Sequence, residues 1–130
     1  MEKKILLIED DFAIIDIYKT VLETNGFDLE VITWGEKALE KIEKVKDRKE
    51  PKSDIVLLDL ILPDMNGIEI LRKIKGQEET KDLPVFILTN YDSKDLAKEA
   101  KSLNVEDFIL KTDCTPSELI KLIKKKLKLD

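Results

Sequence analysis

The stretch DIVLLDLILPDMNG, residues 54–67, carries a short apolar run followed by an acidic residue and a turn. The run does not alternate apolar with polar side chains, which is typical of a parallel strand covered by helices on both faces. Pro63 and Gly67 end the extended segment and lead into a helical pattern that stops at Gly76. We therefore predict a buried strand over 54–60 that brings Asp59 to one edge of a sheet.

Four further apolar runs flank this stretch, with helical patterns between them. They are KILLI (4–8), DLEVITW (28–34), VFILTN (85–90) and DFILK (107–111). Strands that alternate with helices form a parallel sheet through right-handed crossovers. The predicted fold class is α/β: a doubly wound, five-stranded, flavodoxin-like (βα)5 domain over residues 1–130, with strand order 2-1-3-4-5.

The helical patterns carry specific end signals. The first stops at NG (25–26), a C-terminal cap, and the last opens with TPSE (115–118), which combines an N-cap, an early proline and a capping-box glutamate. The pattern over 93–103 has few apolar residues, so we expect a marginally packed helix. Trp34, at the end of the second strand, is predicted to be buried. The apolar face of the first helix is predicted to consist of Ile14, Tyr18, Val21 and Leu22.

Composition and charge argue against several classes of protein. Charged residues make up 39% of the 130 residues and the net charge is −5, so no dominant basic surface for nucleic acid is expected. The lysine-rich stretch 121–129 has apolar residues at helical spacing and is interpreted as a solvated helix face. Cys114 is the single cysteine, and no apolar run is long enough for a signal peptide or a membrane span. We expect a soluble cytoplasmic protein that binds neither nucleic acid nor membranes directly.

Acidic residues stand at two of the predicted strand ends. Glu9, Asp10 and Asp11 follow the first strand, and Asp59 lies at the end of the third. In the predicted strand order these ends are neighbours, so the carboxylates would repel one another. A hard divalent cation would offset that repulsion, and a site with few protein ligands suits Mg²⁺. For Asp11 alone, a helix cap is the better interpretation.

A hydroxyl and an ammonium group join the same edge. Thr89 lies at the end of the fourth strand and Lys111 at the end of the fifth. A carboxylate nucleophile, a cation, a lysine and a hydroxyl donor are the groups that phosphoryl transfer needs. Each residue alone would be an ordinary strand end, so the prediction depends on their convergence.

The motifs IEDD, DIVLLDLILPDMNGIEIL, ILTN and DFILK, in this order and spacing, resemble the receiver domains of two-component response regulators. The resemblance covers essentially the whole chain, and DLILPDMNG (59–67) is its most specific part. It implies these roles: Asp59 as phosphoacceptor, Thr89 as hydroxyl switch residue, Lys111 as the lysine of the site, Phe108 as switch aromatic, Asp10 and Asp59 as direct Mg²⁺ ligands, the main-chain carbonyl of Ile61 as third protein ligand, and Glu9 as a ligand through water.

The resemblance also implies a mechanism and partners. A histidine kinase or histidine phosphotransfer protein would present phosphohistidine, and Asp59 would attack in line. Thr89 and Lys111 would contact the resulting acyl phosphate, and Phe108 would swing inward. The surface of the fourth helix, fifth strand and fifth helix would then control an unknown downstream protein. Such a domain is a phosphoacceptor and not an enzyme, because it promotes only its own phosphorylation and dephosphorylation.

Some positions differ from the usual receiver pattern. Thr112 stands where proline usually follows the lysine. Since a non-proline cis bond costs about 3–4 kcal/mol, we predict a trans bond and a different loop before the last helix. Asn90 replaces a small residue after Thr89. Ile61 and Tyr91 flank the site and would hinder an attacking water molecule, which predicts a long-lived phosphoaspartate.

Three alternatives belong to other classes. A flavodoxin-like electron carrier needs free amides for a flavin phosphate after the first strand, where Glu9, Asp10 and Asp11 would repel it. A haloacid-dehalogenase-type phosphatase needs a second acid two residues after Asp59, where Ile61 stands. The remaining alternative is a phosphorylation-independent, receiver-like module for protein interaction. We expect a monomer or a weak dimer, and the sequence leaves open whether the chain is a stand-alone relay of the chemotaxis type or part of a longer protein.

Overall fold

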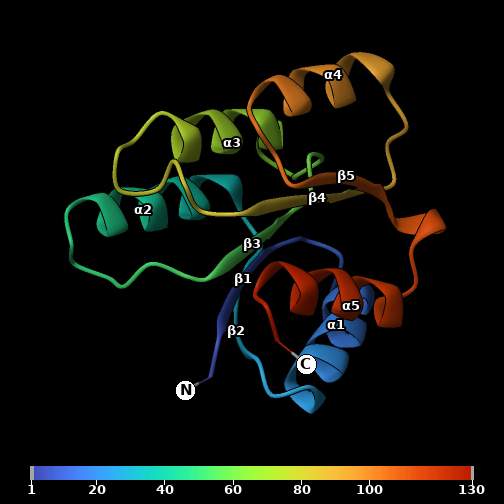
Figure 1. Cartoon of the computed structure of the whole chain (residues 1–130). Coiled ribbons are helices and arrows are strands. Elements are labelled where there is room, and N and C mark those ends of the chain that lie inside the picture. Colours follow the sequence, from blue (N-terminus) through green and yellow to red (C-terminus); the bar gives the residue numbers. More distant parts are fainter. Residues whose placement is uncertain (1, 130) are drawn as a thin grey trace.

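The computed structural model describes residues 2–129, which fold into five parallel strands and five α-helices (Figure 1). The strand order is β2-β1-β3-β4-β5, as predicted. The strands are β1 (Lys4–Ile8), β2 (Asp28–Ile32), β3 (Ile55–Leu58), β4 (Val85–Thr89) and β5 (Asp107–Leu110). The helices are α1 (Phe12–Thr24), α2 (Gly35–Lys46), α3 (Gly67–Lys75), α4 (Lys94–Ser102) and α5 (Pro116–Lys126), with a short 3₁₀ helix, η1 (Lys111–Asp113), before α5.

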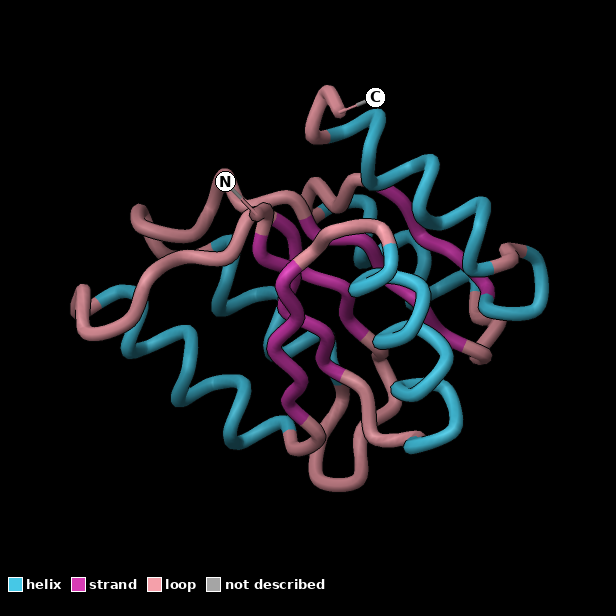
Figure 2. The backbone as a smooth tube through the Cα atoms, turned by 90° about the horizontal axis from the view of Figure 1, so that it is seen from below, coloured by secondary structure: helices cyan, strands magenta, loops and turns pink. Residues whose placement is uncertain are grey.

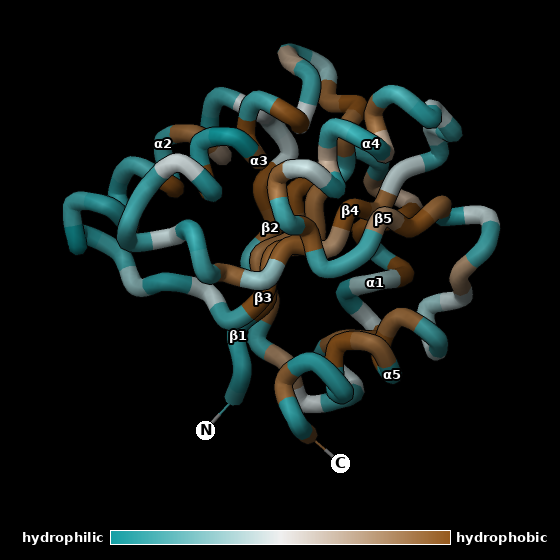
Figure 3. Tube along the Cα trace, turned by 45° about the horizontal axis from the view of Figure 1, so that its top comes forward, coloured by the Kyte–Doolittle hydropathy of each residue, from teal (hydrophilic) through white to brown (hydrophobic). Residues whose placement is uncertain are grey.

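The sheet lies between two layers of helices. Figure 1 shows α2, α3 and α4 on one face and α1 and α5 on the other, and Figure 2 shows the strands side by side between them. Because successive side chains of a strand point to opposite faces, Leu6 and Leu58 pack in one apolar core while Leu7 and Leu57 pack in the other. Hydrophobic segments accordingly gather along the strands in Figure 3. Burial on both faces explains the unbroken apolar run of β3.

Strand pairing places two acidic residues next to each other. β1 and β3 pair in parallel as far as Ile8 and Leu58, the last residues of both strands. One residue further on, the Asp59 N–H donates to the Ile8 carbonyl at 3.0 Å, and the Glu9 N–H donates to the Ile32 carbonyl at 3.1 Å. Glu9 and Asp59 therefore leave neighbouring strands at the carboxyl edge of the sheet.

The ends of α1 and α5 follow their sequence signals. The Asp11 side chain caps the start of α1. The helix ends at Thr24, Asn25 is its C-cap residue, and Gly26 follows with a φ of +85°. α5 begins after Thr115, whose side chain and that of Glu118 form a complete capping box. These ends confirm the interpretation of the NG and TPSE signals.

The predicted apolar face of α1 packs against the core: Tyr18 and Leu22 are buried, and Ile14 and Val21 are partly buried. Ile15, which the prediction left out, is also buried. The predicted burial of Trp34 was wrong. Trp34 is 52% exposed. The pairing of β2 with β1 ends at Ile32, so Trp34 lies beyond the sheet and directly before α2.

Several strands end earlier than predicted. β3 ends one residue before Asp59, and β5 ends before Lys111, which begins η1. The reason is that strand pairing stops where the chain turns toward the next helix, so Asp59 and Lys111 lie just past the strands. α4 fully buries only Ala100, in agreement with the expected marginal packing. Within residues 2–129 no helix has the length and apolar composition needed to cross a membrane.

Candidate functional site

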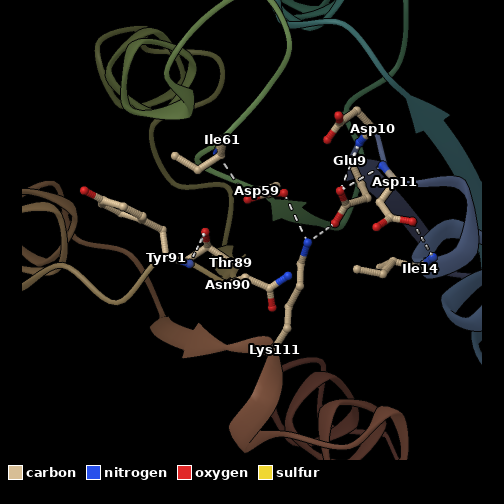
Figure 4. Close-up of a pocket in the computed structure, with 10 residues that line it drawn as sticks. All are labelled: Glu9, Asp10, Asp11, Ile14, Asp59, Ile61, Thr89, Asn90, Tyr91 and Lys111. Atoms are coloured by element: carbon tan, nitrogen blue, oxygen red, sulfur yellow. Dashed lines mark hydrogen bonds and ion pairs between the residues drawn. The ribbon is translucent and has the colours of Figure 1, made fainter.

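A pocket of about 330 Å³ lies at the carboxyl edge of the sheet (Figure 4). Ten residues line it: Glu9, Asp10, Asp11, Ile14, Asp59, Ile61, Thr89, Asn90, Tyr91 and Lys111. The structure thus brings together every site residue expected from the sequence except Phe108.

Glu9, Asp10 and Asp59 form the acidic part of the pocket. One carboxylate oxygen from each lies within 4.8 Å of the others. Glu9 and Asp59 are 2% and 7% exposed, so water screens their repulsion only weakly. Burial and the negative charge of Asp59 raise the pKa of Glu9, against the opposing effect of Lys111. A cluster of this kind requires positive charge nearby.

Lys111 supplies one positive charge to the cluster. Its Nζ donates to Glu9 Oε1 and, at 3.1 Å, to Asp59 Oδ2 (Figure 4). Burial acts to lower the pKa of Lys111, but the hydrogen bond to Glu9 and the charges of Asp59 and Glu9 together raise it above its ordinary value. The lysine therefore stays protonated, and one ammonium group faces the three carboxylates.

Thr112 does not divert this lysine from the cluster. Residues 2–129 contain no cis peptide bond, as predicted for the bond between Lys111 and Thr112. The 3₁₀ turn η1 begins at Lys111 and forms the connection to α5. Lys111 therefore reaches Glu9 and Asp59 although Thr112, and not proline, follows it.

Main-chain amides hold the acidic residues that follow β1. The N–H groups of Asp10 and Asp11 donate to Glu9 Oε2 at 3.0 and 3.2 Å. Asp11 Oδ1 accepts from the N–H groups of Ala13 and Ile14 at 3.0 and 3.3 Å. This confirms the interpretation of Asp11 as a helix cap, and it separates Asp11 from the cluster of the other three acids.

The loop between β3 and α3 folds back over Asp59. The Ile61 N–H donates to Asp59 Oδ1 at 3.2 Å, and Ile61 pairs with Asn66 in an isolated antiparallel bridge. Gly67 lies against the main chain of Asp59, where a Cβ would stand 2.5 Å from the carbonyl oxygen. Among the described residues, no main-chain N–H donates to the Ile61 carbonyl oxygen, which leaves this oxygen available as a ligand.

Asp64 connects this loop to α2, a role that its position in the sequence does not reveal. Its Oδ1 accepts from the Gly35 N–H at 2.8 Å and its Oδ2 from the Glu36 N–H at 2.9 Å. These two hydrogen bonds lower the pKa of Asp64, and the bond from the Glu36 N–H has the larger effect. One sequence signal could have indicated this contact. Trp34 occupies the N-cap position of α2, and its side chain forms no capping hydrogen bond, so the helix needs a cap from elsewhere in the chain. Asp64 therefore caps α2 from a distant part of the chain.

The two predicted switch residues lie on neighbouring strands. Thr89 is fully buried, and its Oγ1 accepts from the Tyr91 N–H at 3.2 Å. Phe108 is partly buried outside the pocket and packs against the core cluster beneath α2, α3 and α4. It lies two residues before Leu110, the partner of Thr89 in the sheet. The coupled movement of Thr89 and Phe108 stays a prediction.

Ile61 and Tyr91 lie on one flank of the pocket. They are 51% and 52% exposed, and Figure 4 shows the Tyr91 ring pointing away from the acidic cluster. Asn90 lies between this flank and Lys111 in the same view. The predicted long lifetime of a phosphoaspartate gains no support from this open flank and stays a prediction.

The chain is similar to proteins of known family. Residues 5–124 match the family described as the response regulator receiver domain. The DNA-binding response regulator MtrA of Mycobacterium tuberculosis is 33% identical over 129 residues, which are 98% of this chain and 52% of MtrA. The chain spans about half the length, or less, of the curated relatives that it matches.

Two solved structures have the same fold over nearly their whole length. A response regulator receiver domain protein (CheY-like) from Methanospirillum hungatei JF-1 superposes with a TM-score of 0.83 and 29% identity, covering 98% of this chain and 95% of that one. The phosphorylated cyanobacterial phytochrome response regulator RcpA superposes with a TM-score of 0.81 and 28% identity, covering 96% of this chain and 91% of that one.

Proposed function

The chain belongs to the response regulator receiver domain family of two-component systems, and from this premise we propose that it accepts a phosphoryl group on Asp59 with the help of Mg²⁺. The observation that carries the proposal is the convergence of Asp59 with Glu9, Asp10 and Lys111 in one pocket. Three carboxylates facing one ammonium group leave an excess of negative charge that a divalent cation would neutralise.

The donor set of the pocket suits Mg²⁺. Asp10 and Asp59 would bind the ion directly, together with the carbonyl oxygen of Ile61. Glu9 would act through a water molecule, because Lys111 and two main-chain amides already hold its carboxylate. So few protein ligands leave positions for water and phosphoryl oxygens, as Mg²⁺ prefers. The bound ion would neutralise charge on the phosphoryl oxygens.

Asp59 would act as the nucleophile. A carboxylate oxygen would attack the phosphorus of a phosphohistidine, the P–N bond would break, and the imidazole would leave. Lys111, which already donates to Asp59 Oδ2, would then donate to a phosphoryl oxygen. The buried Thr89 hydroxyl would donate to another. Because these contacts exist only after transfer, they can stabilise a second conformation.

Exposed apolar side chains near the pocket support a docking partner. Phe12 and Ile17 of α1 are 75% and 51% exposed, and Ile17 shares a second hollow with Lys111. Large apolar side chains that gather around a polar site favour protein association. We assign this surface to a histidine kinase or a histidine phosphotransfer protein that presents phosphohistidine. A downstream protein would contact the surface of α4, β5 and α5.

Intact-mass measurement after incubation with Mg²⁺ and phosphoramidate tests this function. The wild type should gain one phosphoryl group, and this gain should disappear in EDTA and in Asp59→Asn. Asp11→Asn is the matched control, because Asp11 lies beside the cluster but caps α1; it should keep the gain. If the wild type forms no adduct at any Mg²⁺ concentration, the phosphorylation-independent interaction module becomes the better function.

A further inference from the structure

The second hollow, which Ile17 shares with Lys111, lies between α1 and the start of α5 (Figure 1). Its volume is about 200 Å³, and it is lined by Ile14, Ile17, Tyr18, Lys111, Cys114 and Pro116. Two of these residues, Ile14 and Lys111, also line the pocket of Asp59, where Figure 4 shows them. The hollow therefore lies next to that pocket, on the other side of the lysine.

Tyr18 brings a hydroxyl without a partner to the hollow. The residue is 6% exposed, and within residues 2–129 its hydroxyl takes part in no hydrogen bond. In the same part of the chain, every fully enclosed side-chain oxygen or nitrogen has a partner, so the Tyr18 oxygen keeps contact with open space. The hollow that Tyr18 lines supplies this space.

This hydroxyl is a hydrogen-bond donor at neutral pH. Burial raises the pKa of Tyr18 above its ordinary value, against the opposing effect of the Lys111 charge. A nearly buried polar group that lacks a partner lowers the stability of the folded chain. A ligand that pairs with the hydroxyl would remove this cost.

Water fits the hollow poorly because few other polar groups face it. Three of the six lining side chains, those of Ile14, Ile17 and Pro116, are aliphatic. The Cys114 thiol donates to the carbonyl of the next residue at 3.6 Å, and the Lys111 ammonium donates to the acids of the other pocket. An ordered water molecule needs about two to four polar partners. The lining is better suited to an apolar molecule with a single polar group.

The volume and the charges limit the ligand further. An apolar cavity of about 150 Å³ holds one benzene molecule, so this hollow has room for one ring and a small substituent. Negative charge on the ligand would be unfavourable, because three carboxylates already face the one ammonium group of Lys111. The ligand is therefore neutral.

We propose that this hollow binds a small neutral molecule that consists of one ring and a hydroxyl or carbonyl group. The ring would pack against the aliphatic walls, and the polar group would pair with the Tyr18 hydroxyl. The ligand would also contact the side chain of Lys111. It would restrain the lysine in the position from which it donates to Glu9 and Asp59.

The consequence for phosphorylation rests on the proposed function, whereas the binding of the ligand does not. In the proposed reaction Lys111 leaves Asp59 and donates to a phosphoryl oxygen. A ligand that restrains the lysine would slow this step. We therefore expect an occupied hollow to slow the phosphorylation of Asp59.

An NMR titration with phenol and toluene tests the binding site. Both probes have one ring, but only phenol has a hydroxyl. We expect phenol to shift the amide signals of Ile17 and Cys114. Tyr18→Phe should weaken phenol binding by about threefold to tenfold and change toluene binding by less than about twofold. The matched variant Tyr91→Phe removes the other tyrosine hydroxyl of the chain and should leave both affinities unchanged. Ile17→Ser, at an exposed position, should weaken the binding of both probes.

Three results would overturn this site. The first is an equal change in the affinities of phenol and toluene in Tyr18→Phe, which would show unspecific apolar binding only. The second is tighter binding of benzoate than of phenol, which would contradict a neutral ligand. The third is a clear loss of stability of Tyr18→Phe in urea, because it would show that the hydroxyl already has a partner inside the free protein.

The rate of phosphoryl transfer separates this inference from the proposed function. With Mg²⁺ and phosphoramidate, saturating phenol should slow adduct formation in the wild type by at least about twofold, and toluene-saturated protein should show a similar effect. An unchanged rate in the phenol-saturated wild type would reject the restraint of Lys111. If phenol binds as expected but no adduct forms with or without it, the phosphoacceptor function alone is rejected.

Discussion

Glu9, Asp10 and Asp59 share one ammonium group, and this shortage of positive charge governs how the site responds to substitution. Lys111 bonds two of the three carboxylates, and both of these are almost fully buried. In the absence of Mg²⁺ the repulsion between them lowers the stability of the folded protein. The site is therefore built for a charged ligand and not for maximal stability of the free chain.

We expect Asp59→Asn to stabilise the metal-free protein. The substitution removes one buried charge, while Lys111 keeps its bond to Glu9 and the amide oxygen can still accept from the Ile61 N–H. The free energy of unfolding in EDTA should rise by about 1 kcal/mol. Urea unfolding of the wild type and the variant measures this. Asp16→Asn, an exposed acid of α1, is the control and should change little.

Adding Mg²⁺ should reduce the difference in the free energy of unfolding between the wild type and Asp59→Asn, or reverse its sign. If Mg²⁺ binds the folded wild type as proposed, the stability of the wild type should rise with Mg²⁺ concentration, whereas the variant would lack one proposed ligand and should respond weakly. A variant that is less stable than the wild type in EDTA would contradict the view that repulsion dominates the free site.

The members of the site could be predicted from sequence, but some of their contacts could not. Because parallel strand ends meet at one edge, the acids after β1 and β3 had to be near Thr89 and Lys111. That Lys111 bonds Glu9 as well as Asp59 depends on the torsions of a long side chain, which no local pattern encodes. The exposure of Trp34 likewise depends on where pairing with β1 stops.

At the scale of elements, the loop after β3 is held by contacts to two helices. Asp64 accepts from the first two amides of α2, and Asn66 caps α3 by accepting from the Ile68 N–H at 2.9 Å. The same loop carries Asp59 and Ile61 at its start. The position of the expected metal ligands thus depends on both helix ends.

Asp64→Asn should loosen the start of α2. The variant loses the charge that interacts with the helix N-terminus, so amide hydrogen exchange at Gly35 and Glu36, followed by NMR, should become faster. In the wild type the folded pKa of Asp64 lies below its ordinary value of 3.8. The ionised carboxylate therefore contributes stability above pH 3.8, and this contribution is lost as the pH falls through the lower folded value.

The pH dependence separates this cap from an ordinary surface charge. The stability difference between wild type and Asp64→Asn should persist at neutral pH and shrink as the pH falls below 3.8. Asp16→Asn should show no such trend in Gly35 or Glu36 exchange. Unchanged exchange at both amides in Asp64→Asn would show that the cap does not hold α2.

Gly67→Ala should be more damaging than Gly26→Ala, although only Gly26 has a positive φ. A Cβ at Gly67 would stand 2.5 Å from the Asp59 carbonyl oxygen and 2.8 Å from Leu60 Cα, so main chain must move. We expect a loss of about 1–3 kcal/mol in the free energy of unfolding. At Gly26 a Cβ meets no atom of the described residues within 4 Å, and the cost is about 1 kcal/mol from the left-handed conformation alone.

Urea unfolding of the two alanine variants measures both losses. Gly67→Ala should also weaken Mg²⁺ binding, because the main chain that must move belongs to Asp59, whereas Gly26→Ala should leave Mg²⁺ affinity unchanged. Equal stability of the two variants, with equal Mg²⁺ affinity, would contradict this account of the loop.

Most elements could be predicted because their signals are local. The five apolar runs, the NG end of α1 and the capping box of α5 each specify backbone conformation within a few residues. The cap of α2 could not be predicted, since its capping residue lies 28 or 29 positions away from the amides that it accepts from. The end of a helix or strand that depends on a residue far away in the sequence can be located only in the folded structure.

At the scale of the whole molecule, the predicted position of the site depends mainly on the strand order. Right-handed crossovers and unbroken apolar runs predicted the order β2-β1-β3-β4-β5 with helices on both faces, and the structure confirms it. This order places the acidic pocket at one edge of β1 and β3 and leaves β5 at the outer side of the sheet. The surface of α4, β5 and α5 was expected only through the resemblance to receiver domains, because no local pattern in the sequence indicates it.

The most direct test of the central claim is to locate the phosphoryl group. The wild type is treated with Mg²⁺ and phosphoramidate, the acyl phosphate is reduced with borohydride, and the peptides are sequenced by tandem mass spectrometry. Reduction converts a phosphorylated aspartate to homoserine, and we expect homoserine at position 59 and at no other position. Homoserine at Asp10 or Asp11, or unmodified aspartate throughout, would contradict the assignment of Asp59 as the phosphoacceptor.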